Sequence, residues 1–203
     1  LELRRKNALK SGDENCCGVR LSGSAELPAC LETVAAHPLW TGREAWRKAA
    51  PPFTRRGVGL AAVFNGMGYG RGLADMAIAK VELTPAGGGL VYASVADMGQ
   101  GNISAFALLA AQELNQDAGA VDLVLPDTER CHPSGSSSAG RTTYTFGNAL
   151  LRACAALRHK LLARAAMVLL CDNLDDMMLE PGRVLRAPKG KALPLAVMCR
   201  LLP

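Results

Sequence analysis

Two neighbouring segments with a two-residue period place the strongest constraint on how this chain can fold. Residues 74–84 and 89–97 have the short, alternating pattern of β-strands, and a Pro-Ala-Gly-Gly-Gly run that begins at residue 85 connects them. A glycine-rich connection of this length is typical of a β-hairpin. One face of the first segment carries small or apolar side chains: Ala77, Ala79, Val81 and Leu83. Because Lys80 and Glu82 occupy the opposite face, we expect a sheet with one face packed against a core and the other partly exposed to solvent.

Helical patterns follow the hairpin. Residues 103–116 place apolar side chains at helical spacing, which predicts an amphipathic helix. A further strand is predicted at 121–125, and a second helix is predicted from about residue 145 to 170, after a long polar loop. A short apolar run at 58–64, bounded by glycine, predicts a strand before the hairpin. This order of elements predicts an α+β fold with a mixed sheet covered by helices.

The first quarter of the chain has a different pattern. Residues 1–55 are mixed in composition and contain one short helical motif, with Pro28 in its first turn. The apolar residues of this motif are Leu27, Leu31 and Val34. We expect the helix to end near His37, because a proline follows. We therefore predict two parts, residues 1–55 as an N-terminal connector region and residues 56–203 as the α+β domain portion.

Charge and composition argue against several classes of protein. The net charge of +5 is spread along 203 residues, and aromatic residues make up only 4%, which gives little support for a nucleic-acid groove. No segment reaches the roughly 18 apolar residues of a membrane-spanning helix. Seven cysteines, none in a Cys-x-x-Cys spacing, indicate neither a disulfide framework nor a zinc or iron–sulfur site. We expect a protein of the reducing cytoplasm.

The sequence DMGQGN, from Asp97 to Asn102, lies between a predicted strand and a predicted helix. Backbone N–H groups at the start of a helix are free donors at the positive end of the helix dipole, so a phosphate or an electron-rich ring can dock there. Gly99 and Gly101 permit close approach of a ligand, and Gln100 offers both donors and an acceptor. The alternative interpretation is a glycine-rich turn with a glutamine that faces solvent.

Small hydroxyl side chains gather in a second segment, residues 134–143, directly before the long predicted helix. They are Ser134, Ser136, Ser137, Ser138, Thr142 and Thr143. Arg141 adds a guanidinium, and hydroxyls, backbone donors and guanidinium groups are the usual means of holding phosphates. A serine-rich linker is the alternative. Because both clusters follow a predicted strand and precede a predicted helix, they can converge on one ligand.

Other motifs in the chain give weaker evidence for a functional site. The run GMGYGRG at 66–72 lacks a dinucleotide fingerprint, since Arg71 stands where the last glycine is needed and a strand follows. We interpret it as a loop between strands. The three histidines are isolated, and Asp127 is interpreted as a turn residue at a strand end. We therefore predict no catalytic and no metal-binding residue in this chain.

Several segments match one family in the same order along the chain. LELRRKNALKSGD is similar to an Arg-x-x-Asn stretch with a Gly-Asp turn, and DMGQGN matches a Gly-Gln-Gly segment. VDLVLPDT matches the next strand and its Asp-Thr turn. SSSAGRTTYTFGNAL is similar to a Thr/Ser-Ala-Ser-Arg stretch before a long helix, with Gly140 where serine is usual. Together these segments resemble the molybdenum-cofactor-binding region of the xanthine dehydrogenase and aldehyde oxidoreductase family.

The resemblance implies a molybdopterin cofactor with molybdenum, often in its cytosine dinucleotide form. It implies that Gly99, Gln100, Gly101 and Asn102 contact the pterin or its phosphates. It also implies contacts to the pterin–phosphate arm from the following residues: Ser137, Ser138, Ala139, Gly140, Arg141 and Thr142. The implied activity is that of a molybdenum hydroxylase, which oxidises an aldehyde or an N-heterocycle and passes electrons to iron–sulfur clusters and FAD in partner subunits or domains.

The family pattern is incomplete in this sequence. The family's catalytic glutamate would follow residue 203, and its Phe-Arg-Gly motif would precede Leu1. We therefore expect a portion of the enzyme that needs the remaining molybdopterin-binding segments or subunit, an iron–sulfur subunit and possibly an FAD subunit for turnover of a small-molecule substrate. The alternative is a non-catalytic remnant or an assembly module of the same family.

Overall fold

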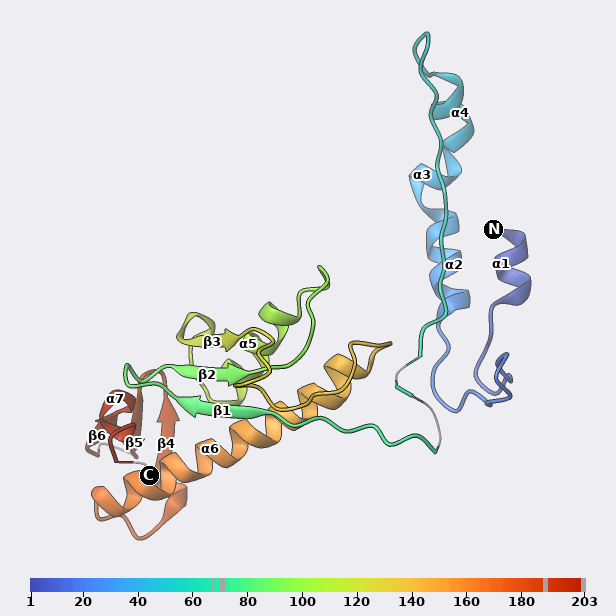
Figure 1. Ribbon diagram of the computed structural model, residues 1–203. Helices are drawn as coiled ribbons and strands as arrows, with labels where there is room; N and C mark the ends of the chain where they lie inside the picture. The colour runs from blue at the N-terminus through green and yellow to red at the C-terminus, as the bar shows by residue number, and fades with distance from the viewer. Residues whose placement is uncertain (67, 70–71, 188–189, 202–203) are drawn as a thin grey trace. The chain divides into compact units, whose positions relative to one another are not determined.

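The computed structural model describes residues 1–66, 68–69, 72–187 and 190–201, and the chain forms two compact units. These units are Leu1–Phe64 and Asn65–Pro203 (Figure 1). The predicted division at residue 55 into a connector region and a domain portion stays a prediction. In the described part of the chain, no helix is both long and apolar enough to span a membrane.

The first unit is helical. Its helices are α1 (Glu2–Asn7), α2 (Leu27–Ala36), α3 (Pro38–Thr41) and α4 (Arg43–Lys48). The predicted helix is confirmed as α2, with Pro28 in its first turn. His37 separates α2 from α3, because its Nδ1 accepts a hydrogen bond from the Leu39 backbone N–H at 3.2 Å and so caps α3. Arg5 donates to both carboxylate oxygens of Glu32, at 2.8 and 2.7 Å, and thereby joins α1 to α2.

The prediction of a strand at residues 58–64 is wrong. These residues form no strand, and the side chain of Val63 is 87% exposed. An isolated extended segment gains neither ladder hydrogen bonds nor side-chain burial, so its apolar composition alone does not make it a strand.

The second unit contains the predicted mixed sheet. Its strands are β1 (Lys80–Leu83), β2 (Gly89–Tyr92) and β3 (Val121–Val124), in the order β1-β2-β3. β1 and β2 pair antiparallel as the predicted hairpin, whereas β2 and β3 pair parallel. The hairpin loop is closed by Thr84, whose Oγ1 accepts from the Gly88 N–H at 3.0 Å. The side chains predicted to face the core, Ala77, Ala79, Val81 and Leu83, pack against it.

Two helices cover this sheet and supply most of the core. They are α5 (Asn102–Glu113) and α6 (Gly147–Val168), and a π-helical turn (Thr142–Phe146) leads into α6. Phe106 of α5 and Phe146 of the π-helical turn are both fully buried, and their rings meet edge to face with centroids 4.9 Å apart. Figure 1 shows α6 running beneath the hairpin toward the second sheet. The predicted α+β fold and both predicted helices are confirmed.

A second sheet follows α6 and is not predicted by the sequence patterns. It consists of β4 (Met177–Glu180), β5 (Arg183–Arg186) and β6 (Ala192–Pro194), all antiparallel, and is followed by α7 (Leu195–Met198). Short 3₁₀ helices precede β3 (Ala118–Ala120) and β4 (Leu174–Asp176). The side-chain amide of Gln116 donates to the Glu180 carbonyl at 2.9 Å and accepts from the Gly182 N–H at 2.7 Å. These bonds tie the segment after α5 to the β4–β5 turn.

The Phe106–Phe146 contact gives a test of this core. Phe146→Ala should lower the free energy of unfolding by about 3–5 kcal/mol, because it removes a fully buried ring and leaves a cavity between α5 and α6. Tyr144→Ala is the matched control, since that ring lies two residues away and is 64% exposed. Urea denaturation followed by circular dichroism measures both. Equal losses in the two variants would contradict this account of the core.

Candidate functional site

The segment from Asp97 to Asn102, named here the Gly-Gln-Gly loop, is organised by the Asp97 carboxylate. Asp97 Oδ1 accepts from the backbone N–H groups of Gly99 and Gly101, at 2.9 and 3.2 Å, and Oδ2 accepts from the Ile103 N–H at 3.1 Å. These bonds, the one from Ile103 first, lower the pKa of Asp97. The Asp97 carboxylate thus occupies three backbone N–H groups at the start of α5 that were predicted to be free for a ligand.

Backbone geometry requires both glycines of this loop. Gly99 has φ of 104° and Gly101 has φ of 83°, a region that is unfavourable for residues with a Cβ. A Cβ built on either glycine would meet no atom within 4 Å. The space at both glycines is therefore open, and these two positions present bare backbone next to the exposed side chains of Met98 and Gln100.

The side chain of Gln100 lies along its own loop. Its Oε1 accepts from the Met98 N–H at 2.6 Å, and its Nε2 donates to the Ala96 carbonyl at 2.9 Å. Asn102, which is buried, donates its side-chain amide to the same carbonyl at 3.0 Å. Both amides therefore fix the loop on Ala96, which stands directly before Asp97.

Arg141 is the most heavily bonded side chain of the second cluster, the segment 134–143 named here the hydroxyl loop. Its side chain is fully buried. Nε donates to Asp75 Oδ1 at 2.6 Å. Nη1 donates to the carbonyls of Ser134 and Ser136, at 3.0 and 2.6 Å, and Nη2 donates to those of Met76 and Ser134, at 3.1 and 3.0 Å. All five N–H donors of the guanidinium are used within the protein.

Close packing around Arg141 constrains its neighbours. Gly135 has φ of 74°, and a Cβ at this position would lie 2.5 Å from Arg141 Nη2. Asp75 also accepts from the Thr145 hydroxyl at 3.2 Å, so one carboxylate joins the guanidinium to the π-helical turn. The Ser134 hydroxyl is buried beside this cluster without a hydrogen-bond partner among the described residues.

A third segment, around Tyr69, contacts the hydroxyl loop. The Tyr69 and Ser136 hydroxyls are hydrogen-bonded, and the Arg141 guanidinium lies 5.2 Å from the centroid of the Tyr69 ring. The Gly140 N–H donates to the Gly66 carbonyl at 2.9 Å. Residues 67, 70 and 71 of the GMGYGRG run lie outside the described residues, and its described members adjoin the second cluster.

Ser137 of the hydroxyl loop contacts Ala96, the residue directly before the Gly-Gln-Gly loop. The Ser137 hydroxyl accepts from the Ala96 N–H at 3.1 Å and lies 3.4 Å from the Ala96 carbonyl oxygen. The same carbonyl holds the amides of Gln100 and Asn102. Two segments 41 residues apart in the sequence are therefore fixed on one another through a single residue.

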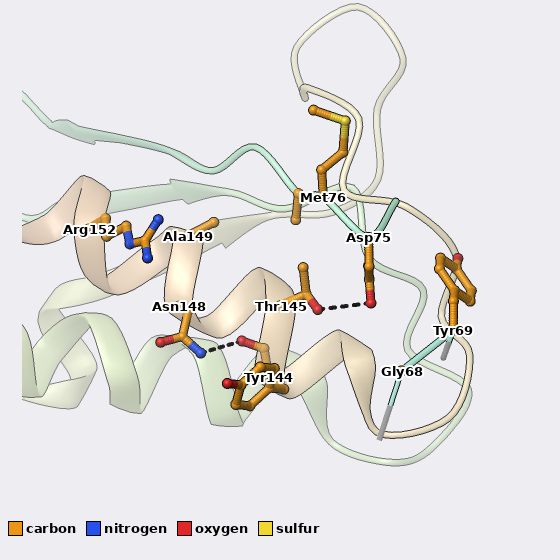
Figure 2. A pocket seen from close by; sticks show the side chains of 10 residues that line it. Gly68, Tyr69, Asp75, Met76, Tyr144, Thr145, Asn148, Ala149 and Arg152 are labelled. Atoms are coloured by element: carbon orange, nitrogen blue, oxygen red, sulfur yellow. Dashed lines mark hydrogen bonds between the residues drawn. The ribbon is translucent and has the colours of Figure 1, made fainter. Parts of the chain in front are cut away.

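An open pocket of about 770 Å³ lies between residues 68–69 and 75–77 on one side and the π-helical turn and the start of α6 on the other. Its walls carry the side chains of Tyr69, Asp75, Tyr144, Thr145, Asn148 and Arg152, and Figure 2 shows Tyr144, Asn148 and Arg152 along one side of the helix. Figure 2 also shows the Thr145–Asp75 bond on the pocket wall. Asp75 thus lines this pocket, while its ion-pair partner Arg141 belongs to the hydroxyl loop.

The predicted site residues occupy two kinds of environment. Some are exposed to solvent: Gly99, Gln100, Gly101, Ser138 and Ala139. Ser137 and Gly140 are half-buried, while Asn102, Arg141 and Thr142 are buried. The structure brings the two predicted clusters together through the contact between Ser137 and Ala96. It also assigns structural roles to Asp75 and Asp97, which no sequence pattern marks as site residues. A carboxylate two residues before Gly99 is the signal that could have identified Asp97.

Comparisons with known proteins agree with this architecture. A family model described as a molybdopterin cofactor-binding domain matches residues 33–201. The chain is 29% identical over 152 residues to a probable xanthine dehydrogenase subunit of Bacillus subtilis (strain 168), covering 75% of this chain and 20% of that protein. It is 28% identical over 171 residues to the putative xanthine dehydrogenase molybdenum-binding subunit of Escherichia coli (strain K12), covering 83% of this chain and 23% of that protein.

A solved structure shares the fold. The reconstituted CO dehydrogenase from Oligotropha carboxidovorans superposes with a TM-score of 0.61 at 18% identity, covering 97% of this chain and 26% of that chain. The chain therefore spans about a fifth to a quarter of the length of the proteins that it matches.

Removal of the buried guanidinium should destabilise the second unit. Arg141→Ala should lower the free energy of unfolding by about 3–5 kcal/mol, because it leaves Asp75 Oδ1 and three backbone carbonyls without their donors. Arg152→Ala, at an exposed arginine of α6, should change it by less than about 0.5 kcal/mol. Urea denaturation measures both variants. An Arg141→Ala variant as stable as Arg152→Ala would overturn the assigned role.

The lowered pKa of Asp97 predicts a pH-dependent contribution to stability. The ionised carboxylate stabilises the loop at pH values above the unfolded pKa of about 3.9, and this stabilisation is lost as the pH falls through the lower folded pKa. Asp97→Asn should therefore be less stable than the natural protein near neutral pH, with a difference that narrows at about pH 3. Asp122→Asn, exposed on β3, controls for the loss of one charge. A difference independent of pH would contradict the prediction.

Proposed function

Because the chain belongs to the molybdopterin cofactor-binding domain family, we propose that its Gly-Gln-Gly loop and hydroxyl loop hold part of a molybdopterin cofactor in a molybdenum hydroxylase. The observation that carries this proposal is the junction at Ser137, which fixes the two loops against each other through Ala96. One extended ligand can contact both loops, since both expose small residues at this junction.

The donors around the junction suit a pterin with phosphates. Two glycines with open space above them give a flat ring access to the backbone. The exposed hydroxyl of Ser138 is a neutral donor of the kind that binds phosphate oxygens. Arg141 has no N–H donor left for a phosphate in this arrangement, because all five are bonded within the protein.

Burial divides the proposed site residues by role. We assign direct contact with the pterin or its phosphate arm to the exposed and half-buried residues: Gly99, Gln100, Gly101, Ser137, Ser138, Ala139 and Gly140. Asn102, Arg141 and Thr142 are buried and act as positioning residues that keep the two loops in place. The bonds of Asn102 to Ala96 and of Arg141 to Ser136 support this division.

The proposal extends to the whole enzyme. The bound cofactor supplies a molybdenum centre that oxidises an aldehyde or an N-heterocycle. The residues of this chain bind and orient the cofactor. The proposed partners are the remaining molybdopterin-binding segments, an iron–sulfur subunit and an FAD subunit or domain. The cofactor is proposed to be the cytosine dinucleotide form, in a cytoplasmic enzyme.

Reconstitution tests this function. The chain should be co-produced with the remaining segments of a related molybdenum-binding subunit, and the purified complex analysed for molybdenum, pterin and released nucleotide. We expect molybdenum and pterin in equal amounts, with cytidine monophosphate after hydrolysis, and neither in a complex that lacks this chain. A stable complex without molybdenum or pterin would contradict cofactor binding and would favour the assembly-module alternative.

Gln100→Ala tests the Gly-Gln-Gly loop in that complex. The substitution removes the bonds to Met98 and Ala96 that hold the loop, at about 0.5–1.5 kcal/mol each, so cofactor affinity should fall roughly 2- to 12-fold per lost bond. Gln112→Ala, exposed on α5, is the matched control and should retain the cofactor. Molybdenum content after dialysis provides the measurement. Full retention by Gln100→Ala would exclude Gln100 from the site.

A further inference from the structure

The apolar segment at residues 58–64, VGLAAVF, has the geometry of a β-strand that lacks a partner. Residues 54–64 run without a turn or a bend, and Figure 1 shows this stretch as a long extended trace after α4. From residue 56 to residue 61, half-buried and exposed positions alternate. The half-buried positions are Arg56, Val58 and Leu60. A burial period of two is that of a strand with one face against a support.

The backbone of this segment is open for pairing. Among the described residues, no N–H or C=O group from residue 57 to residue 64 forms a backbone hydrogen bond. The apolar side chains at its end also lack cover, since Val63 is 87% exposed and Phe64 is 65% exposed. A run of seven apolar residues with open backbone groups is the kind of edge to which another strand adds.

Two glycines on the exposed side of the segment have no explanation within the described part of the chain. Neither Gly57 nor Gly59 has a φ in the left-handed region, and a Cβ added at either position would meet no atom within 4 Å. Neither the backbone conformation nor the packing of the chain therefore requires glycine here. Glycine within a strand often marks a place where another backbone approaches closely, and such an approach accounts for both positions.

The comparisons indicate which polypeptide supplies the partner strand. The molybdopterin cofactor-binding domain model matches residues 33–201, so the segment lies inside the domain. The chain spans only about a fifth to a quarter of the length of the proteins that it matches, and those proteins therefore contain much further polypeptide. We propose that residues 58–64 become a β-strand by pairing with an open sheet edge in the remaining molybdopterin-binding segments. The identity of this partner rests on the proposed function.

Hydrogen exchange followed by mass spectrometry tests the pairing, in the whole chain alone and in its complex with the remaining segments of a related molybdenum-binding subunit. In the chain alone, the amides of residues 58–64 should exchange at the rate of an unstructured peptide, because they have no backbone partner among the described residues. In the complex, the amides that face the partner should exchange at least about 100-fold more slowly. Slow exchange in the chain alone, or unchanged exchange in the complex, would overturn the proposal.

Proline substitutions test the same pairing through affinity. Neighbouring N–H groups of a strand point to opposite edges, so one of Ala61→Pro and Ala62→Pro must remove a donor that faces the partner. That variant should weaken the complex at least about tenfold, and both variants should fold normally, because neither N–H is bonded within the described part of the chain. Ser24→Pro is the matched control, since Ser24 is exposed and its N–H is likewise without a described backbone partner. Full affinity in both alanine variants would contradict the strand.

Sedimentation measures the complex and metal analysis measures the cofactor, so the strand and the proposed function can fail separately. A complex that contains molybdenum while residues 58–64 exchange freely overturns the strand and leaves cofactor binding supported. A complex with a protected segment and no molybdenum supports the strand and contradicts cofactor binding. Absence of any complex with the natural chain contradicts both. Self-association of the chain alone that protects residues 58–64 overturns the assigned partner in favour of a second copy.

Discussion

One buried guanidinium holds the candidate cofactor site together. Arg141 forms an ion pair with Asp75 and donates to three backbone carbonyls, two of them in the hydroxyl loop. An unpaired charge at this depth would cost several kcal/mol, so the loop must keep the conformation that satisfies every donor. The residues bonded to Arg141 include Asp75 and Met76 of the segment before β1, so this segment and the hydroxyl loop are positioned together.

A second carboxylate has the equivalent role in the other loop. Asp97 bonds to three backbone N–H groups around Gly99 and Gly101, which stabilises a turn with two residues of positive φ. Ser137 then joins the loops through Ala96. In both loops, charged side chains stabilise the scaffold, while glycine, serine and alanine, together with Met98, Gln100 and Thr143, form the exposed surface. A ligand at this surface meets neutral donors, and the strongest charges remain fixed within the protein.

Local patterns in the sequence predict the elements whose residues carry a clear period. The hairpin, β3, α5 and α6 follow from alternation, glycine-rich loops and helical spacing, because these signals lie within a few neighbouring residues. Composition alone predicts a strand at residues 58–64, yet strand formation needs a partner. The β4–β5 hairpin is not predicted, although Pro181-Gly182 between two apolar segments is a recognisable turn signal.

The sequence predicts the candidate site in position but not in detail. The two small-residue clusters can be identified from their composition and from their positions directly before predicted helices. The structure brings them together. An arginine among serines suggests a phosphate ligand, whereas burial of Arg141 depends on Asp75, which lies 66 residues earlier. No local pattern reveals such a partner. Asp97 belongs to the DMGQGN motif, but its capping bonds depend on the φ angles of the glycines that follow.

A structure of the cofactor-loaded complex that contains this chain tests the central claim most directly. We predict density for the pterin and its phosphate arm in contact with both loops, at Gly99–Gly101 and at Ser138–Gly140, with Arg141 still bonded to Asp75. Density for the cofactor that contacts only one loop, or neither, would contradict the claim that the junction at Ser137 forms the cofactor site.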